Sequence, residues 1–146
     1  MKNTKDEQIV EFKIKDIELL GLRLIQPKQP LIDPTTFHYN ISSELKINIE
    51  NKLVNVVTNI EIFREDKETL LASLTVSCIF EIVNIDKFIN KDTKQVVFPD
   101  ITLITFNSIS ISTVRGIMYS QFKGTFLHNA ILPIIDPTSF VKNSNQ

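Results

Sequence analysis

The sequence predicts an α+β fold: a four-stranded antiparallel sheet with a Pro-rich crossover after the first strand, and one long helix and a short C-terminal helix packed on one face. The main observation is residues 37–50 (FHYNISSELKINIE), where apolar and polar side chains alternate for fourteen residues. Such alternation places the apolar side chains on one face of a strand, whereas a helix would spread them around its surface. Three more apolar runs, separated by turns or prolines, provide the neighbouring strands. An antiparallel sheet with one covered and one solvated face follows.

Composition limits what this chain can be. Its 146 residues are expected to form a single domain spanning 1–146, with 1–8 and 143–146 disordered. The net charge is −1 without a basic patch, so we expect no nucleic-acid binding. The polar start (MKNTKDEQ) lacks the apolar core of a signal peptide, and no apolar run approaches the roughly 18 residues of a membrane span. We therefore expect a cytoplasmic protein without membrane insertion, in agreement with its single cysteine.

The first strand is predicted over residues 9–25, where the apolar residues keep coming but change phase. Phe12 and Ile14 share one parity, and the parity then switches twice before residue 25. Such a switch usually marks a bulge, and Gly21 is a natural place for one. Apolar residues of both parities also predict burial on both faces, at a subunit contact. The next segment, 26–34 (QPKQPLIDP), contains three prolines and is therefore predicted to be an extended crossover loop.

Two further strands are predicted after residues 37–50, joined by short turns. The break at Asn51-Lys52 leads into a strand over 53–64, and a charged turn at 65–68 leads into a strand over 69–84. In both strands the apolar side chains share one face: Val54, Val56, Ile60 and Ile62 in the first, and Leu70, Ala72, Leu74, Val76, Cys78, Phe80 and Ile82 in the second.

The rest of the chain has a less regular pattern. Residues 85–94 are predicted to be a loop, and Pro99 suits the start of a helix over 101–121. Helix spacing fits that run, although its many Ile, Thr and Ser residues and its partial alternation also fit a strand; helix is the preferred interpretation. Residues 131–135, with Pro133 inside, are predicted to be extended. Asp136-Pro137 is typical of a helix start, so a short helix should follow.

Residues with catalytic or metal-binding chemistry are few and scattered. His38 and His128 are ninety positions apart and make no ligand set, so each is interpreted as exposed or structural. Cys78 lies on an apolar strand face and is interpreted as a small core residue. Three glycines in all leave no Gly-rich phosphate loop, and no nucleophile motif occurs. We therefore expect no enzyme activity, no metal and no cofactor.

Apolar residues are also abundant in segments that should be solvated: the Pro-rich crossover, the loop after the fourth strand, and the irregular stretch 122–140. They could close the core or fill an oligomer interface. Alternatively, they could form a long groove for apolar segments of other chains, because contiguous exposed apolar surface generally marks an interaction site. A further alternative is that the protein is an adaptor with one fixed partner, which would bind to the same apolar surface. A small-ligand carrier or enzyme is disfavoured, since no polar groups converge on the apolar face.

Five short motifs occur in an order that resembles a known family. They are Gln26-Pro27-Lys28-Gln29-Pro30, Ile79-Phe80, Val97-Phe98-Pro99, Val114-Arg115-Gly116 and Leu132-Pro133-Ile134-Ile135. Over residues 9–140 this order resembles the SecB-type export chaperones. The resemblance implies a SecB-like domain, a homo-oligomer (dimer or tetramer) with helices between two sheets, and ATP-independent binding of non-native polypeptide clients. The groove residues it implies are Leu31, Ile32, Phe37, Tyr39, Ile41, Phe126, Leu127, Ile131, Ile134, Ile135 and Phe140.

The chain departs from that family where the family contacts the SecA motor. Two acids of the family's first strand correspond to Gly21 and Ile25, and a third acid corresponds to Ser73. The family's metal-binding tail has no counterpart in VKNSNQ. The resemblance therefore does not predict a handoff to SecA. SecB-like relatives also guard antitoxins that fold poorly alone, and a dedicated chaperone of that sort is the alternative to one for protein export.

Overall fold

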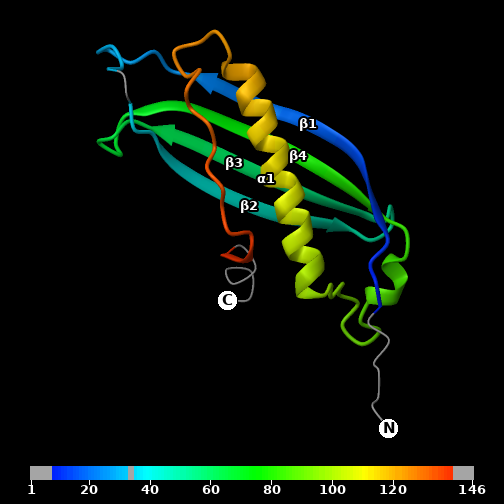
Figure 1. Cartoon of the computed structure of the whole chain (residues 1–146). Helices are drawn as coiled ribbons and strands as arrows, with labels where there is room; N and C mark the ends of the chain where they lie inside the picture. The colour runs from blue at the N-terminus through cyan, green and yellow to red at the C-terminus, as the bar shows by residue number, and fades with distance from the viewer. Residues whose placement is uncertain (1–7, 33–34, 140–146) are drawn as a thin grey trace.

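The computed structural model describes residues 8–32 and 35–139 (Figure 1). The strands are β1 (Phe12–Leu24), β2 (His38–Asn48), β3 (Leu53–Phe63) and β4 (Leu70–Ile82), followed by the 3-10 helix η1 (Ile85–Phe88) and the helix α1 (Asp100–Phe122). All neighbouring strands are antiparallel, in the order β1-β4-β3-β2. This confirms the predicted sheet. It also shows what the Pro-rich crossover does: it carries the chain from one edge of the sheet to the other.

The core lies between the sheet and α1, which crosses one face (Figure 1). Its aromatic centre joins three elements, because Phe106 of α1 stacks on Phe80 of β4 at 4.7 Å between ring centroids. Phe12 of β1 meets both rings edge-on, at 4.9 Å from Phe106 and 5.8 Å from Phe80. Edge-on and offset-stacked pairs add stabilisation beyond the apolar area they bury. The alternation predicted for β3 is confirmed, since Val54, Val56, Ile60 and Ile62 are all buried. In β4 the predicted residues from Ala72 to Ile82 are buried as well, whereas Leu70 at the start of the strand is partly buried.

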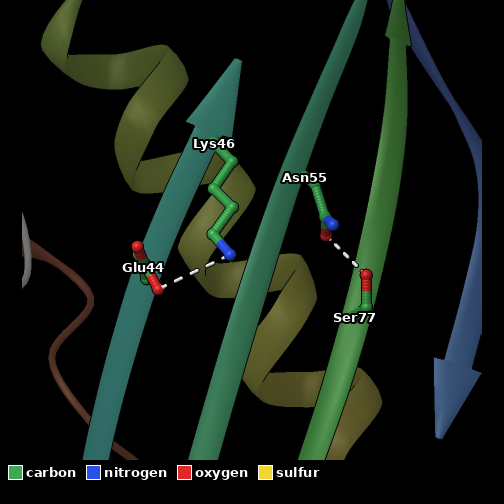
Figure 2. A network of polar contacts seen from close by, with 4 residues as sticks. All are labelled: Glu44, Lys46, Asn55 and Ser77. Atoms are coloured by element: carbon green, nitrogen blue, oxygen red, sulfur yellow. Dashed lines mark hydrogen bonds and ion pairs between the residues drawn. The ribbon is translucent and has the colours of Figure 1, made fainter. Parts of the chain in front are cut away.

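The opposite face of the sheet is polar, and Figure 2 shows it with α1 behind the strands. Ser77 of β4 donates a hydrogen bond to Asn55 of β3. A second cross-strand bond runs from Thr75 Oγ1 to Asn59 Oδ1 at 3.3 Å. On β2 the ion pair between Lys46 Nζ and Glu44 spans 4.0 Å and is exposed, so it contributes little stability. This is the solvated face that the sequence predicted.

The pairing of β1 with β4 explains why the apolar residues of β1 change phase. Its register against β4 shifts between Ile14 and Asp16 and again between Leu19 and Gly21. Directly paired residues point to the same side of a sheet, and the partners of these apolar residues are buried under α1. The two shifts therefore keep one row on the helix side: Ile14, Ile17, Leu19, Leu22 and Leu24. The bulge at Gly21 is confirmed, but the expectation of apolar rows on both faces is wrong. Each bulge adds one unpaired residue, so the positions that face the helix change from even to odd numbers or back.

Residues 100–122 are helical, which settles the ambiguity of the sequence in favour of the helix. A stripe of buried residues, including Phe106, Ser110, Val114 and Met118, faces the sheet. The hydroxyls that lower helix propensity bond back to the preceding turn: Ser110 Oγ donates to the carbonyl of Phe106 at 2.8 Å. By length and composition α1 could cross a membrane. One stripe of the helix packs on the sheet, and helices of a protein core pass the same test, so length and composition alone do not identify a membrane span.

The chain after α1 turns at Gly124, whose φ of 79° suits glycine. Residues 131–136 are extended, as predicted, and run over the sheet beside α1 (Figure 1); we call them the C-terminal strap. Thr138 and Ser139 are helical, and the remainder of the predicted short helix lies outside the described residues. The predicted loop at 85–94 is more ordered than expected, because η1 and a β-bridge between Ile89 and Val96 organise it.

Candidate functional site

An apolar cleft of about 750 Å³ opens where three separate segments meet. The crossover supplies one wall, Thr35 and Phe37 just before β2 supply the floor, and the turn after α1 supplies the other wall. We call it the crossover cleft, and its lining residues are Gln26, Pro27, Lys28, Pro30, Leu31, Thr35, Phe37, Phe126, His128 and Asn129. Its volume is within the range of protein sites that enclose most of a small ligand, and it would accommodate a few side chains of an extended peptide.

A single side chain holds the crossover wall by donating hydrogen bonds to two of its backbone carbonyls. Arg64, which follows β3, donates from Nη1 to the carbonyl of Gln29 at 2.8 Å and from Nη2 to that of Pro30 at 3.4 Å. Pro27 and Pro30 have no N–H, so this segment cannot join the sheet and stays at its rim. Before the prolines, the amide of Ile25 donates to the carbonyl of Leu71 at 2.8 Å and fixes the point of departure.

The opposite wall is a tight turn anchored in the core. Thr125 Oγ1 donates to the carbonyl of Phe122 at 2.7 Å, and the amide of His128 donates to the carbonyl of Thr125 at 3.2 Å. Leu127 is fully buried and pins this turn to the core. Phe126, one residue earlier, is partly buried and lines the cleft. A rigid turn thus presents one aromatic ring toward the crossover.

The C-terminal strap is fixed by Arg115 of α1. Its Nε donates to the carbonyl of Leu132 and its Nη2 to that of Pro133, each at 2.8 Å. Leu132 is buried, and Ile135 packs against the core at partial exposure. The strap therefore covers part of the sheet beyond the cleft, on the side of β2 (Figure 1).

Three of the groove residues implied by the resemblance come together in the crossover cleft: Leu31, Phe37 and Phe126. Tyr39 and Ile41 continue from Phe37 along β2, both partly buried against the core. Burial raises the pKa of Tyr39 to about 12, so its phenol is neutral at physiological pH. These five residues form a continuous apolar path from the cleft along β2.

The other implied residues lie elsewhere. Ile32 is 81% exposed and lines a separate hollow with Arg64, Glu65 and Asp66. Leu127 has no exposed surface, so it anchors the wall and cannot itself contact a client. On the strap Ile131 and Ile134 are exposed whereas Ile135 is partly buried. Phe140 lies outside the described residues.

Sequence reasoning missed the polar residues of the cleft, chiefly Lys28, His128 and Asn129. They lie next to apolar residues that drew attention in the same segments, and this proximity was the only signal that could have identified them. His128 is exposed, as interpreted from the sequence, and its Nδ1 lies 3.0 Å from the carbonyl of Thr125.

The chemistry of the cleft lining is simple. Among the described residues the lining contains no carboxylate and no cysteine. Cys78 is buried in the core, where desolvation raises the pKa of its thiol and hydrogen bonds with Ser110 and Thr113 act in the opposite direction. Within residues 8–32 and 35–139, no three His, Cys, Asp or Glu side chains gather as a metal site would require. What the cleft offers chemically is apolar burial with a polar rim.

The antiparallel sheet, its Pro-rich crossover and the single covering helix define an α+β protein of the SecB-like fold. The sequence matches no protein-family profile and no curated protein. The structure matches that of the SecB-like chaperone Rv1957 of Mycobacterium tuberculosis, solved in complex with a ChAD peptide from the antitoxin Rv1956 HigA1. The match has a TM-score of 0.62 at 12% sequence identity and covers 85% of this chain and 89% of that one. It confirms the fold that the motifs predicted.

Proposed function

We propose that this protein is an ATP-independent holdase chaperone that binds apolar segments of non-native polypeptides in the crossover cleft. One observation carries the proposal: Leu31, Phe37 and Phe126, from three segments far apart in the sequence, line one apolar cleft. The mycobacterial protein of the same fold, which binds an antitoxin peptide, supports a polypeptide as the ligand. Hydrogen bonds within the chain hold both walls of the cleft, which supports binding without ATP.

Binding would combine side-chain burial with backbone pairing. An apolar client side chain entering the cleft loses contact with water, which is favourable by about 25 cal/mol per Å² and depends little on side-chain identity. The cleft continues into β2, an edge strand without a bulge whose described neighbour in the sheet is β3 alone. An extended client can add its backbone to such an edge. Both interactions tolerate many sequences, as a general holdase requires.

We further propose that the chain works as a homo-oligomer, through the apolar row of β1. The five helix-side residues of that row, Ile14, Ile17, Leu19, Leu22 and Leu24, are between 37% and 47% exposed. A contiguous row of this kind marks a protein interface. A second copy of the chain would cover it.

The alternative is a chaperone with one dedicated partner. The antitoxin peptide in the mycobacterial complex favours this alternative over a role in protein export, and so does the absence of the family acids at Gly21, Ile25 and Ser73. Both alternatives use the same cleft and differ in the range of clients.

Aggregation suppression tests the proposal. A chemically unfolded, unrelated protein is diluted into buffer containing this protein without ATP, and light scattering is followed. We expect dose-dependent suppression, weakened about tenfold by Phe37→Ser, because truncating a buried aromatic anchor usually costs more than about 1 kcal/mol. Ile131→Ser tests whether the groove extends onto the strap. Ile32→Ser, outside the cleft, is the matched control and should suppress like the wild type.

Failure has a clear form. If Phe37→Ser, with an unchanged circular dichroism spectrum, suppresses aggregation as well as the wild type, the cleft is not the binding site. If the wild-type oligomer suppresses nothing, general holdase activity is excluded, and pull-downs then decide whether one dedicated partner exists.

A further inference from the structure

The rim of the crossover cleft is electrostatically one-sided. Among the described residues that line it, the polar groups are amides, a hydroxyl, an imidazole and the ammonium group of Lys28, and none is Asp or Glu. Lys28 is exposed and has no ion-pair partner among residues 8–32 and 35–139. The guanidinium of Arg64 lies directly behind the same wall, bonded to the carbonyls of Gln29 and Pro30. Arg64 itself lines the neighbouring hollow, where its charge, after the hydrogen bonds from Thr69, helps to lower the pKa of Asp66, so Lys28 is the charged group that the described lining presents to the cleft.

The carboxylates at this end of the molecule belong to a different hollow. Glu65 and Asp66 line it together with Arg64, Ile32 and Thr35. Asp66 accepts hydrogen bonds from the amides of Glu68 and Thr69 and from the Thr69 hydroxyl, at 2.6 to 3.0 Å. Glu65 Oε1 accepts from the amide of Thr36 at 3.4 Å. The two hollows adjoin at Thr35, which lines both, but the two carboxylates take hydrogen bonds from their own turn and from Thr36 and are not among the residues that line the crossover cleft.

We propose that the cleft prefers apolar segments flanked by acidic residues, such as an aromatic or aliphatic side chain next to Asp or Glu. The apolar side chain would contact Leu31, Phe37 and Phe126, and the neighbouring carboxylate would meet Lys28 at the rim. This inference rests on the proposed function, and it adds a substrate class to it. An opposite charge at a rim changes affinity modestly, whereas a like charge in the same place repels.

Fluorescence anisotropy with three labelled peptides tests this preference. The peptides share one apolar core and carry Asp, Ser or Lys on both sides of it. We expect the Asp peptide to bind about three- to tenfold more tightly than the Lys peptide, which is the size of one or two exposed ion pairs. The difference should vanish in about 1 M salt, where the screening length falls to about 3 Å.

Two charge reversals locate the effect. Lys28→Glu should abolish or invert the order of the Asp and Lys peptides. Lys91→Glu changes the net charge equally, but Lys91 lies in the loop between η1 and α1, at the opposite end of the sheet (Figure 1). It should leave the order unchanged. Both lysines are exposed, so neither variant should disturb folding.

The outcomes separate the two proposals. Equal affinity for the three peptides overturns the acidic preference and leaves the holdase proposal standing. A preference that survives in Lys28→Glu shows that the rim is not its source and also overturns the inference. If no peptide binds, whatever its charge, the proposed client-binding function itself fails.

Discussion

The two edge strands carry similar apolar rows toward the helix side of the sheet, but the structure covers most of one row and leaves the other exposed. On β1 the row from Ile14 to Leu24 is at least 37% exposed. On β2 the equivalent residues Tyr39, Ile41 and Leu45 are partly buried and pack against the core, and only Ile47, near the end of the strand, is exposed. α1 packs on β3 and β4, and the C-terminal strap runs on the β2 side of it (Figure 1).

The difference shows how one chain can serve two kinds of contact. The strap and Asn107, which accepts a hydrogen bond from Ser43 at 3.1 Å, cover β2 from within the chain. β2 therefore keeps a bounded apolar path that ends in a cleft, which suits a transient client. β1 has an open apolar row, which suits a permanent partner. We infer that the coverage of an edge strand by the rest of the chain determines whether a transient client or a permanent partner suits it.

The largest effect should come from charging the exposed row of β1. In the double variant Leu19→Lys/Leu22→Lys, self-association should weaken on the order of a hundredfold or more, because two unpaired charges would have to be buried. Light scattering coupled to size-exclusion chromatography measures the mass, and circular dichroism should show a folded monomer.

The control for this variant lies on the same strand. Glu18 pairs with Ser77 on the polar face, so Glu18→Lys adds charge away from the row and should leave the oligomer intact. If the double variant keeps the wild-type mass, the row of β1 is not an oligomer interface and the comparison of the two edges loses its functional meaning.

Releasing the strap should make β2 resemble β1. Arg115→Met removes both bonds to the carbonyls of Leu132 and Pro133 and should cost about 1.5–3 kcal/mol of unfolding free energy, as for hydrogen bonds to charged groups. Denaturant unfolding measures the loss, and limited proteolysis should cut the strap faster. Arg115→Lys should be intermediate, since an ammonium cannot reproduce the guanidinium fork. Wild-type stability and cleavage rate in Arg115→Met would show that the strap is held by packing alone.

The comparison also shows what could be predicted from the sequence about the fold. Alternation in residues 37–50 and 53–82 was enough for β2, β3 and β4, because paired strands with one buried face leave a strict period of two. β1 broke that period, and its two bulges could be suspected only at Gly21. A bulge depends on the partner strand, so the sequence of β1 alone could not reveal that the five apolar residues of its row share one face.

The site was predictable in part for a similar reason. Leu31 and Phe126 stood out as apolar residues in irregular segments, Phe37 was implied by the family resemblance, and the structure brings the three together. The same reasoning could not separate Leu127 from Phe126, because a tight turn has no periodicity that tells the buried neighbour from the exposed one. Lys28 escaped notice since a single exposed lysine gains meaning only from its three-dimensional neighbours.

Tyr39 reports directly on how well β2 is covered. Burial raises its pKa to about 12, above the ordinary value of about 10. The neutral phenol is thus favoured in the folded state, so this contribution to stability is complete below pH 10 and is lost as the pH rises from about 10 to about 12. The chain has two tyrosines. Subtracting the tyrosinate absorbance titration of Tyr39→Phe from that of the wild type therefore isolates Tyr39.

The expected midpoint is about 12 in the wild type, and it should fall toward 10 in Arg115→Met if the strap covers β2. A wild-type midpoint near 10, in protein that circular dichroism shows to be folded, would contradict the coverage of β2 on which the comparison rests.

The smallest effect should come from β3, between the two edges. Thr58 is 1% exposed on the apolar face, and its Oγ1 has no hydrogen-bond partner within the described part of the chain. Thr58→Val replaces this hydroxyl with a methyl group of similar size and should raise the unfolding free energy by about 1 kcal/mol. Ser110→Ala is the matched control, because the Ser110 hydroxyl is buried and bonded, and its loss should not stabilise. Neither residue lies on an edge strand, although Thr58 pairs with Ser43 of β2, and we expect oligomer mass and client affinity to stay the same. If Thr58→Val shifted either of them, the two edges would be coupled through the core and could not be treated as independent surfaces.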